Sequence, residues 1–196
     1  MSEAGTQIGI ARLRAGTTAP TAAGTTAPTA AGPLDLDAVR RALAEVIDPE
    51  LPMLSVVDLG IVHRLDVGLR DGVIRVEILP TFIGCPAIEL IKTAIADRLA
   101  AFGRTVEVTA TFEVPWTSER ISAAGRRALM GAGIAPPTGA TANGGGATLI
   151  DLEPRVACPH CGSRRTVLEN VFGPTQCRTI RYCADCRQPF EAIKPV

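Results

Sequence analysis

The stretch "CPHCGSRRTVLENVFGPTQCRTIRYCADC", residues 158–186, contains two CxxC pairs with a fifth cysteine between them. Cys158 and Cys161 form the first pair, and Cys183 and Cys186 form the second. Two cysteines three positions apart in a tight turn can direct both sulfurs at one metal ion about 2.3 Å away, and two such turns complete a tetrahedron. Four sulfur ligands leave no open position for a substrate. The pattern therefore predicts a structural zinc ribbon over residues 151–196, with iron as the alternative metal because thiolates suit both.

The composition of this segment supports a metal-dependent fold. It has few large apolar side chains, and so small a core usually needs a metal ion to fold. Residues 155–196 carry seven Arg or Lys and three Asp or Glu, and four thiolates around a zinc ion reduce this excess further. So weak a positive charge favours a partner protein as much as DNA, and we expect no nucleic-acid binding.

The chain before the ribbon shows an alternation of helical and strand patterns. The stretch "LDLDAVRRALAEVIDPE", residues 34–50, has apolar residues at helical spacing, with Asp35 or Asp37 as the cap. We expect Pro49 to end this helix, because the residue before a proline disfavours the α conformation. Two β-branched runs then flank "RDG", residues 70–72, which predicts a β-hairpin.

Three further elements follow the hairpin. Residues 85–102 have a helical apolar stripe, and residues 104–114 alternate as a strand that places Val106, Val108, Ala110 and Phe112 on one face. Residues 117–134 predict a shorter helix capped by Ser118. The order α-β-β-α-β-α predicts a small α/β sandwich over residues 34–130.

Two segments have the composition of flexible chain. The octet "AGTTAPTA" occurs at residues 15–22 and again at 23–30, and we expect residues 1–33 to form a disordered tail. Residues 131–150, rich in Gly and Pro, predict a linker. The sequence shows neither a secretory signal nor an apolar run long enough for a membrane span, so we expect a cytoplasmic protein that does not bind membranes. Because the cytoplasm keeps thiols reduced, six cysteines in a cytoplasmic protein favour metal or redox chemistry over disulfides.

Two cysteines lie outside the CxxC pairs. Cys85 directly precedes Pro86, which predicts that Cys85 caps a helix whose free N–H groups stabilise a thiolate. For Cys177, a small buried side chain and a functional thiol are both open. The acids Asp48, Glu50 and Asp58 lie in a Pro- and Gly-containing segment, where turn formation explains them without catalysis.

Taken together, these motifs resemble two protein families. The segments "IDPELPMLSVVDLGIV" and "LPTFIGCPAIE" are similar to the signatures of the MIP-type domain found in iron–sulfur assembly factors and in the bacterial SufT family. The cysteine-rich segment resembles the C-terminal ribbon of the PaaD family, a component of the phenylacetyl-CoA epoxidase system of phenylacetate degradation. Its "FGPTQCR" departs from the pattern of that family at Pro174 and Arg178.

The resemblance implies roles for individual residues. Cys85 corresponds to the reactive cysteine proposed to take part in iron–sulfur transfer, Asp48 and Glu50 match the "DPE" signature, and Asp58 matches "DLG". Cys177 becomes a second candidate thiol for a transient iron–sulfur cluster. The resemblance also implies a MIP/SufT-like fold for the α/β part.

Two functions follow from the resemblance. The first is a non-enzymatic maturation factor for the iron–sulfur cluster of the epoxidase reductase, with a ribbon that docks on the client through the mobile linker. The second is a structural or regulatory subunit of the multicomponent oxygenase. The expected partners are the reductase and other oxygenase subunits or assembly factors, and a homodimer is an open arrangement.

Overall fold

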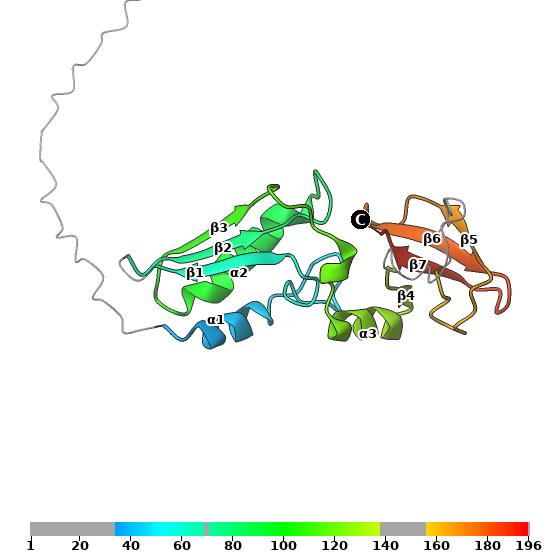
Figure 1. Cartoon of the computed structure of the whole chain (residues 1–196), viewed down its shortest axis with the longest axis horizontal. Helices are drawn as coiled ribbons and strands as arrows, with labels where there is room; N and C mark the ends of the chain where they lie inside the picture. Colours follow the sequence, from blue (N-terminus) through cyan, green and yellow to red (C-terminus); the bar gives the residue numbers. More distant parts are fainter. Residues whose placement is uncertain (1–33, 69–70, 138–155, 196) are drawn as a thin grey trace, which may run out of the picture. The chain divides into compact units, whose positions relative to one another are not determined.

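A computed structural model of the chain describes residues 34–68, 71–137 and 156–195 (Figure 1). The predicted order α-β-β-α-β-α is confirmed, and further strands follow it. The elements are α1 (Leu36–Leu43), β1 (Val62–Val67), β2 (Ile74–Ile78), α2 (Ala87–Ala100), β3 (Val106–Ala110), the 3₁₀ helix η1 (Ser118–Arg120), α3 (Ala123–Gly131), β4 (Ile134–Ala135), β5 (Thr166–Asn170), β6 (Arg178–Cys183) and β7 (Pro189–Ile193). The predicted tail at residues 1–33 lies outside the described residues.

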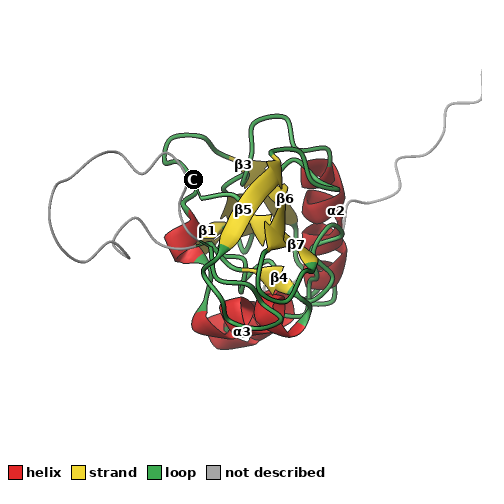
Figure 2. Cartoon of the chain, turned by 90° about the vertical axis from the view of Figure 1, so that its right-hand side faces the viewer, coloured by secondary structure: helices red, strands yellow, loops and turns green. Residues whose placement is uncertain are grey.

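The first sheet has the strand order β1-β2-β3, with β1 antiparallel and β3 parallel to the central β2. On β2, Ile74, Val76 and Ile78 are completely buried, as expected for the apolar face of a central strand. Helix α2 connects β2 to β3 and packs against β3 (Figures 1 and 2), and α1 packs against α2. The predicted hairpin is confirmed, since β1 pairs with β2.

The first helix is shorter than its apolar spacing predicts. Asp35 caps α1 by accepting a hydrogen bond from the Asp37 N–H, but the helix ends at Leu43 and not at Pro49. The following backbone bonds elsewhere, with the Asp48 N–H donating to the Leu54 carbonyl at 2.9 Å. The chain thus leaves the helix before the proline to form the loop that carries the DPE motif.

Two other expectations about element ends were wrong. Ser118 begins the short helix η1, whereas the cap of α3 is Ser122, whose hydroxyl accepts from the Gly125 N–H at 2.9 Å. Phe112 lies beyond the end of β3 and is 64% exposed, because the strand that would have buried it stops at Ala110.

The second sheet has the order β4-β7-β6-β5 and contains the ribbon. Strand β4 directly follows α3 and pairs in parallel with β7, so the chain on both sides of residues 138–155 belongs to one sheet. Ile134 and Ile193 are buried in the same core as the first sheet. The described residues of both sheets belong to one compact unit. The predicted linker therefore begins with residues of α3 and β4, and its remainder lies outside the described residues.

This packing bears on the idea of a mobile ribbon. Strand pairing and shared core residues hold the ribbon against the α/β part, so a docking movement through a free linker is not what the described residues favour. In addition, no helix in the described part of the chain is long and apolar enough to cross a membrane.

Candidate functional site

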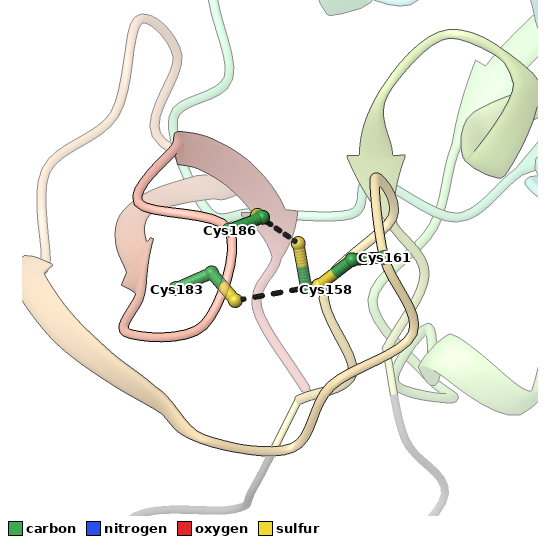
Figure 3. Close-up of side chains that lie close together, drawn as sticks. All are labelled: Cys158, Cys161, Cys183 and Cys186. Carbon is green, nitrogen blue, oxygen red and sulfur yellow. Dashed lines mark hydrogen bonds between the residues drawn. The ribbon is translucent and has the colours of Figure 1, made fainter.

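The four cysteines of the two CxxC pairs converge on one point of the ribbon (Figure 3). All four sulfurs lie within 4.8 Å of one another, with 3.6 Å between Cys158 and Cys186 and 3.6 Å between Cys161 and Cys183. Tetrahedral zinc with bonds of about 2.3 Å would separate its sulfur ligands by roughly 3.8 Å. The donor set and its spacing therefore fit a four-cysteine metal site.

Two equivalent turns place these sulfurs. The Gly162 N–H donates to the Cys158 carbonyl at 2.8 Å, and the Arg187 N–H donates to the Cys183 carbonyl at 2.9 Å. The residue directly after each second cysteine has a positive φ, +77° at Gly162 and +58° at Arg187. Glycine adopts such a φ without strain, whereas arginine does so rarely.

The surroundings of the ribbon cysteines shift the pKa values of Cys183 and Cys186 in opposite directions. Backbone N–H groups of Cys186 and Asp185 lower the pKa of Cys183 to about 7. Burial and the neighbouring thiols raise the pKa of Cys186 to about 12. A bound divalent cation would lower the pKa of all four thiols, because it stabilises each sulfur as a thiolate.

A separate small cavity of about 20 Å³ lies at the DPE loop. Asp48, Glu50, Cys85 and Cys177 all line it, so the two cysteines outside the CxxC pairs meet at one place. The remaining lining is uncharged and largely apolar: Leu51, Leu59, Ile61, Thr81, Ile88, Ile91, Trp116 and Ile193. We call this the thiol cavity.

The DPE loop supplies the carboxylates of the thiol cavity. Asp48 is 5% exposed, and its Oδ1 accepts hydrogen bonds from the N–H groups of Glu50 and Leu51, both at 2.8 Å. Burial raises the pKa of Asp48, although these two bonds oppose the shift. Burial also raises the pKa of Glu50, and the charge of Asp48 adds to the effect.

Cys85 lies one position before the site that the sequence predicted for it. The N-cap of α2 is Pro86, and Ala87 is its first residue. The Ala87 N–H does bond to the thiol, as a stabilised thiolate requires, but burial outweighs it and raises the pKa of Cys85. The expectation of a thiolate favoured by the helix is therefore wrong, because partial burial and nearby acids dominate.

Cys177 reaches the cavity from the loop before β6. Its carbonyl accepts from the Lys194 N–H at 2.9 Å, and its sulfur lies 3.2 Å from the Thr175 hydroxyl. Burial raises the pKa of Cys177. Of the two alternatives left open by the sequence, the structure gives a half-buried thiol that faces a cavity shared with Cys85.

Asp58 does not line the thiol cavity. Its carboxylate accepts from the hydroxyls of Ser55 at 2.9 Å and Ser122 at 2.6 Å, and its carbonyl accepts from the Ser122 N–H. Gly60 of the same motif has φ +72°, and a Cβ there would lie 2.2 Å from the Arg120 carbonyl oxygen. The DLG motif thus holds the start of α3 against this loop.

Sequence reasoning did not assign a role to two residues at the thiol cavity. Trp116 is 4% exposed and donates from Nε1 to the Leu59 carbonyl at 3.1 Å. Arg178 donates to the Glu50 carbonyl at 3.1 Å and pairs with Glu191 at 2.7 Å. The bonds to Leu59 and Glu50 have no sequence signal, because their partners lie 57 and 128 positions away in the chain.

An apolar groove of about 430 Å³ adjoins the thiol cavity and shares Thr81 and Trp116 with it. Phe82, Ile83 and Phe112 line the groove, and Ile83 is 84% exposed. Lys194 lies over the rings of both Phe82 and Phe172, with its Nζ 5.7 Å and 5.6 Å from their centroids.

Comparison with known proteins accounts for both parts of the chain. The family model described as "Iron-sulfur cluster assembly protein" matches residues 36–111, and the one described as "PaaD zinc beta ribbon domain" matches residues 143–194. The chain is 34% identical over 153 residues to an Escherichia coli (strain K12) protein described as a candidate 1,2-phenylacetyl-CoA epoxidase component. That match covers 78% of this chain and 88% of the relative. The chain belongs to the PaaD family.

Further relatives match less than half of this PaaD-family chain. An iron–sulfur cluster carrier protein of Mycobacterium tuberculosis is 36% identical over 83 residues, which cover 42% of this chain and 21% of that protein. A solved DUF59 domain from Bacillus anthracis is 28% identical, covers 47% of this chain and 89% of its own, and has a TM-score of 0.44. The ribbon assignment, and with it zinc as the metal that fits the four cysteines, follows from the family and the geometry.

Proposed function

We propose that this chain is an accessory, non-catalytic protein of the phenylacetyl-CoA epoxidase system that matures the iron–sulfur cluster of the reductase component. An accessory role fits the two matched domains and the Escherichia coli relative described as an epoxidase component. The observation that carries the finer proposal is the thiol cavity, to which the assembly-type domain contributes Cys85 and the ribbon contributes Cys177.

The two parts of the chain have different tasks in this proposal. The ribbon metal is structural: zinc, when bound, fixes the two CxxC turns and hence the sheet that carries Cys177. Arg178 holds the Cys177 loop beside the DPE loop, and Asp48 fixes the conformation of the DPE loop itself. Cys85 and Cys177 then receive the cargo from a donor and pass it to the reductase.

The proposal is tested in cells that lack this protein. The reductase is purified anaerobically, and its iron and acid-labile sulfide are measured. We expect a folded, cluster-depleted reductase that is restored by the wild-type protein and not by Cys85→Ser. Asp66→Asn is a suitable control, since Asp66 is exposed on β1 outside the cavity lining. A fully loaded reductase in the deletion strain would refute the maturation role.

The exposed apolar groove favours a second candidate, a structural or regulatory component of the oxygenase. Phe82, Ile83 and Phe112 present apolar surface of the kind found at protein interfaces. This function predicts co-purification with oxygenase subunits at fixed stoichiometry, lost in Ile83→Asp. Transfer without any stable complex would count against it.

A further inference from the structure

Four acidic groups line the thiol cavity, and none of the described lining residues is a cation. The carboxyls of Asp48 and Glu50 and the thiols of Cys85 and Cys177 supply these acidic groups. The nearby guanidinium of Arg178 is already engaged by the carboxylate of Glu191. Asp48 is buried and the other three groups are half-buried, and within the described lining no cation compensates for the two carboxylates.

The protonation behaviour of these groups agrees with this description. Burial is the first cause that raises the pKa of each of the four acids. The negative charges of Glu50 and Asp48 raise the pKa of both thiols further, whereas the charge of Arg178 lowers the pKa of Asp48, Glu50 and Cys177.

The size and the donors of the cavity limit which cation it can bind. A volume of about 20 Å³ has room for one or two water-sized spheres. Iron–sulfur clusters are usually held by four cysteines, whereas this cavity offers two. Two thiolates with a carboxylate suit a divalent transition-metal ion such as Fe(II), Co(II) or Zn(II), and not Mg²⁺ or Ca²⁺.

We propose that Cys85 and Cys177, together with the Glu50 carboxylate, bind a single divalent transition-metal ion. Each thiol that binds releases its proton to solvent, and no electron is transferred. Asp48 acts as a positioning residue, since its carboxylate is occupied by the N–H groups of Glu50 and Leu51. That the ion is Fe(II) rests on the proposed function, in which this site holds iron for the client rather than a complete cluster.

The geometry predicts that the thiol cavity binds a metal ion with lower affinity than the four ribbon cysteines do. Among the described residues, the four ribbon cysteines are the one set of three or more possible ligands whose atoms all lie within 4.8 Å. The cavity ligands must therefore rotate inward to close on an ion, and that reorganisation lowers affinity. A carrier must release its cargo, so an exchangeable site fits the proposed role.

The experiment uses the full-length protein with its ribbon zinc retained, under anaerobic conditions. Co(II) and, separately, Fe(II) are titrated in, and bound metal, sulfide and cobalt–thiolate absorption are measured. We expect one additional ion per chain and no sulfide. Cys85→Ser and Cys177→Ser should each remove most of the cobalt–thiolate absorption, and Glu50→Gln should weaken binding by about tenfold or more. Glu169→Gln is the matched control, because Glu169 is exposed on β5.

Ribbon zinc, measured in every variant, shows that the variants are folded. The proposal is overturned if no additional ion binds, if binding survives both cysteine changes, or if the bound iron is accompanied by sulfide in a cluster shared by two copies. These outcomes are separate from the reductase assay. A cluster-depleted reductase together with no metal at the cavity would support the maturation role and refute the metal site. A fully loaded reductase together with a bound ion would refute the maturation role and support the metal site.

Discussion

The guanidinium of Arg178 donates a hydrogen bond to the backbone carbonyl oxygen of Glu50, 3.1 Å away and 128 positions earlier in the sequence. The same guanidinium bonds to the Thr175 hydroxyl at 2.9 Å and to the Glu191 carboxylate at 2.7 Å. Arg178 thus ties the loop that carries Cys177 to the DPE loop.

Replacing this arginine with lysine should loosen the thiol cavity. Lysine keeps the charge but cannot make three separate bonds in the plane of a guanidinium, so Arg178→Lys should lower the free energy of unfolding by about 1–3 kcal/mol. Chemical denaturation at constant zinc measures this change. Arg164→Lys, at an exposed position, should have no measurable effect. Equal stability of the two variants would show that the Arg178 contacts contribute nothing.

Replacing Asp58 should lower the stability of the fold and leave metal binding at the thiol cavity unchanged. Asp58→Asn weakens the bonds from Ser55 and Ser122 and should cost about 1–3 kcal/mol of unfolding free energy. Because Asp58 lies outside the thiol cavity lining, the folded variant should bind metal there as the wild type does. Asp66→Asn serves as the exposed control in both measurements. Loss of cavity metal with retained stability would place Asp58 at the site after all.

The two cavity thiols should react slowly at neutral pH. Burial raises the pKa of Cys85 and of Cys177 above the ordinary 9.0, so their thiolate fraction at pH 7–8 is smaller than that of a free thiol. Iodoacetamide labelling, followed by mass spectrometry, should be slower than for glutathione and should still accelerate above pH 9. In the urea-unfolded chain both should label at the glutathione rate. Rates that level off below pH 8 would instead indicate an activated thiolate.

Asp48 should make stability depend on pH in a defined direction. Its folded-state pKa is raised above the ordinary 3.8, so between these two values the folded chain binds more protons than the unfolded chain. Stability contributed by this group is therefore present at low pH and is lost as pH rises through the raised pKa. Measured where both proteins retain zinc, the wild type should lose stability relative to Asp48→Asn as pH rises. A constant difference across that range would exclude the shift.

Removing the ribbon metal should disturb the thiol cavity as well. Cys158→Ser removes one of four ligands, and loss of zinc should unfold the sheet that holds Cys177. Labelling of Cys177 should then approach the rate of an unfolded thiol, while Cys85→Ser should retain one zinc per chain. Unchanged protection of Cys177 in zinc-free protein would show that the ribbon folds without its metal.

Much of this architecture could be predicted because it depends on local spacing. The CxxC pairs, the hairpin around residues 70–72 and the order of helices and strands all follow from residues close in sequence. The N-cap of α3 could not be predicted in this way, because Ser118 and Ser122 can both cap a helix. In the structure Ser122 is the cap, and its hydroxyl also bonds to Asp58, which is far away in the chain.

The thiol cavity shows the same limit more sharply. Cys85 and Cys177 were each singled out from the sequence, but nothing local indicates that they line one cavity. Their meeting depends on β4 pairing with β7 and on Arg178 reaching Glu50. The raised pKa of Cys85 likewise reflects burial first and then the acids that folding brings close, and the helix-cap argument could include neither.

The central claim is that Cys85 and Cys177 act as one site, and a double-mutant comparison tests it most directly. The iron content of the reductase is measured in deletion strains that express Cys85→Ser, Cys177→Ser or both changes, with ribbon zinc verified in each protein. If the thiols act together, each single change should deplete the reductase as far as the double change does. Independent, additive losses, or full loading with Cys177→Ser, would contradict the account.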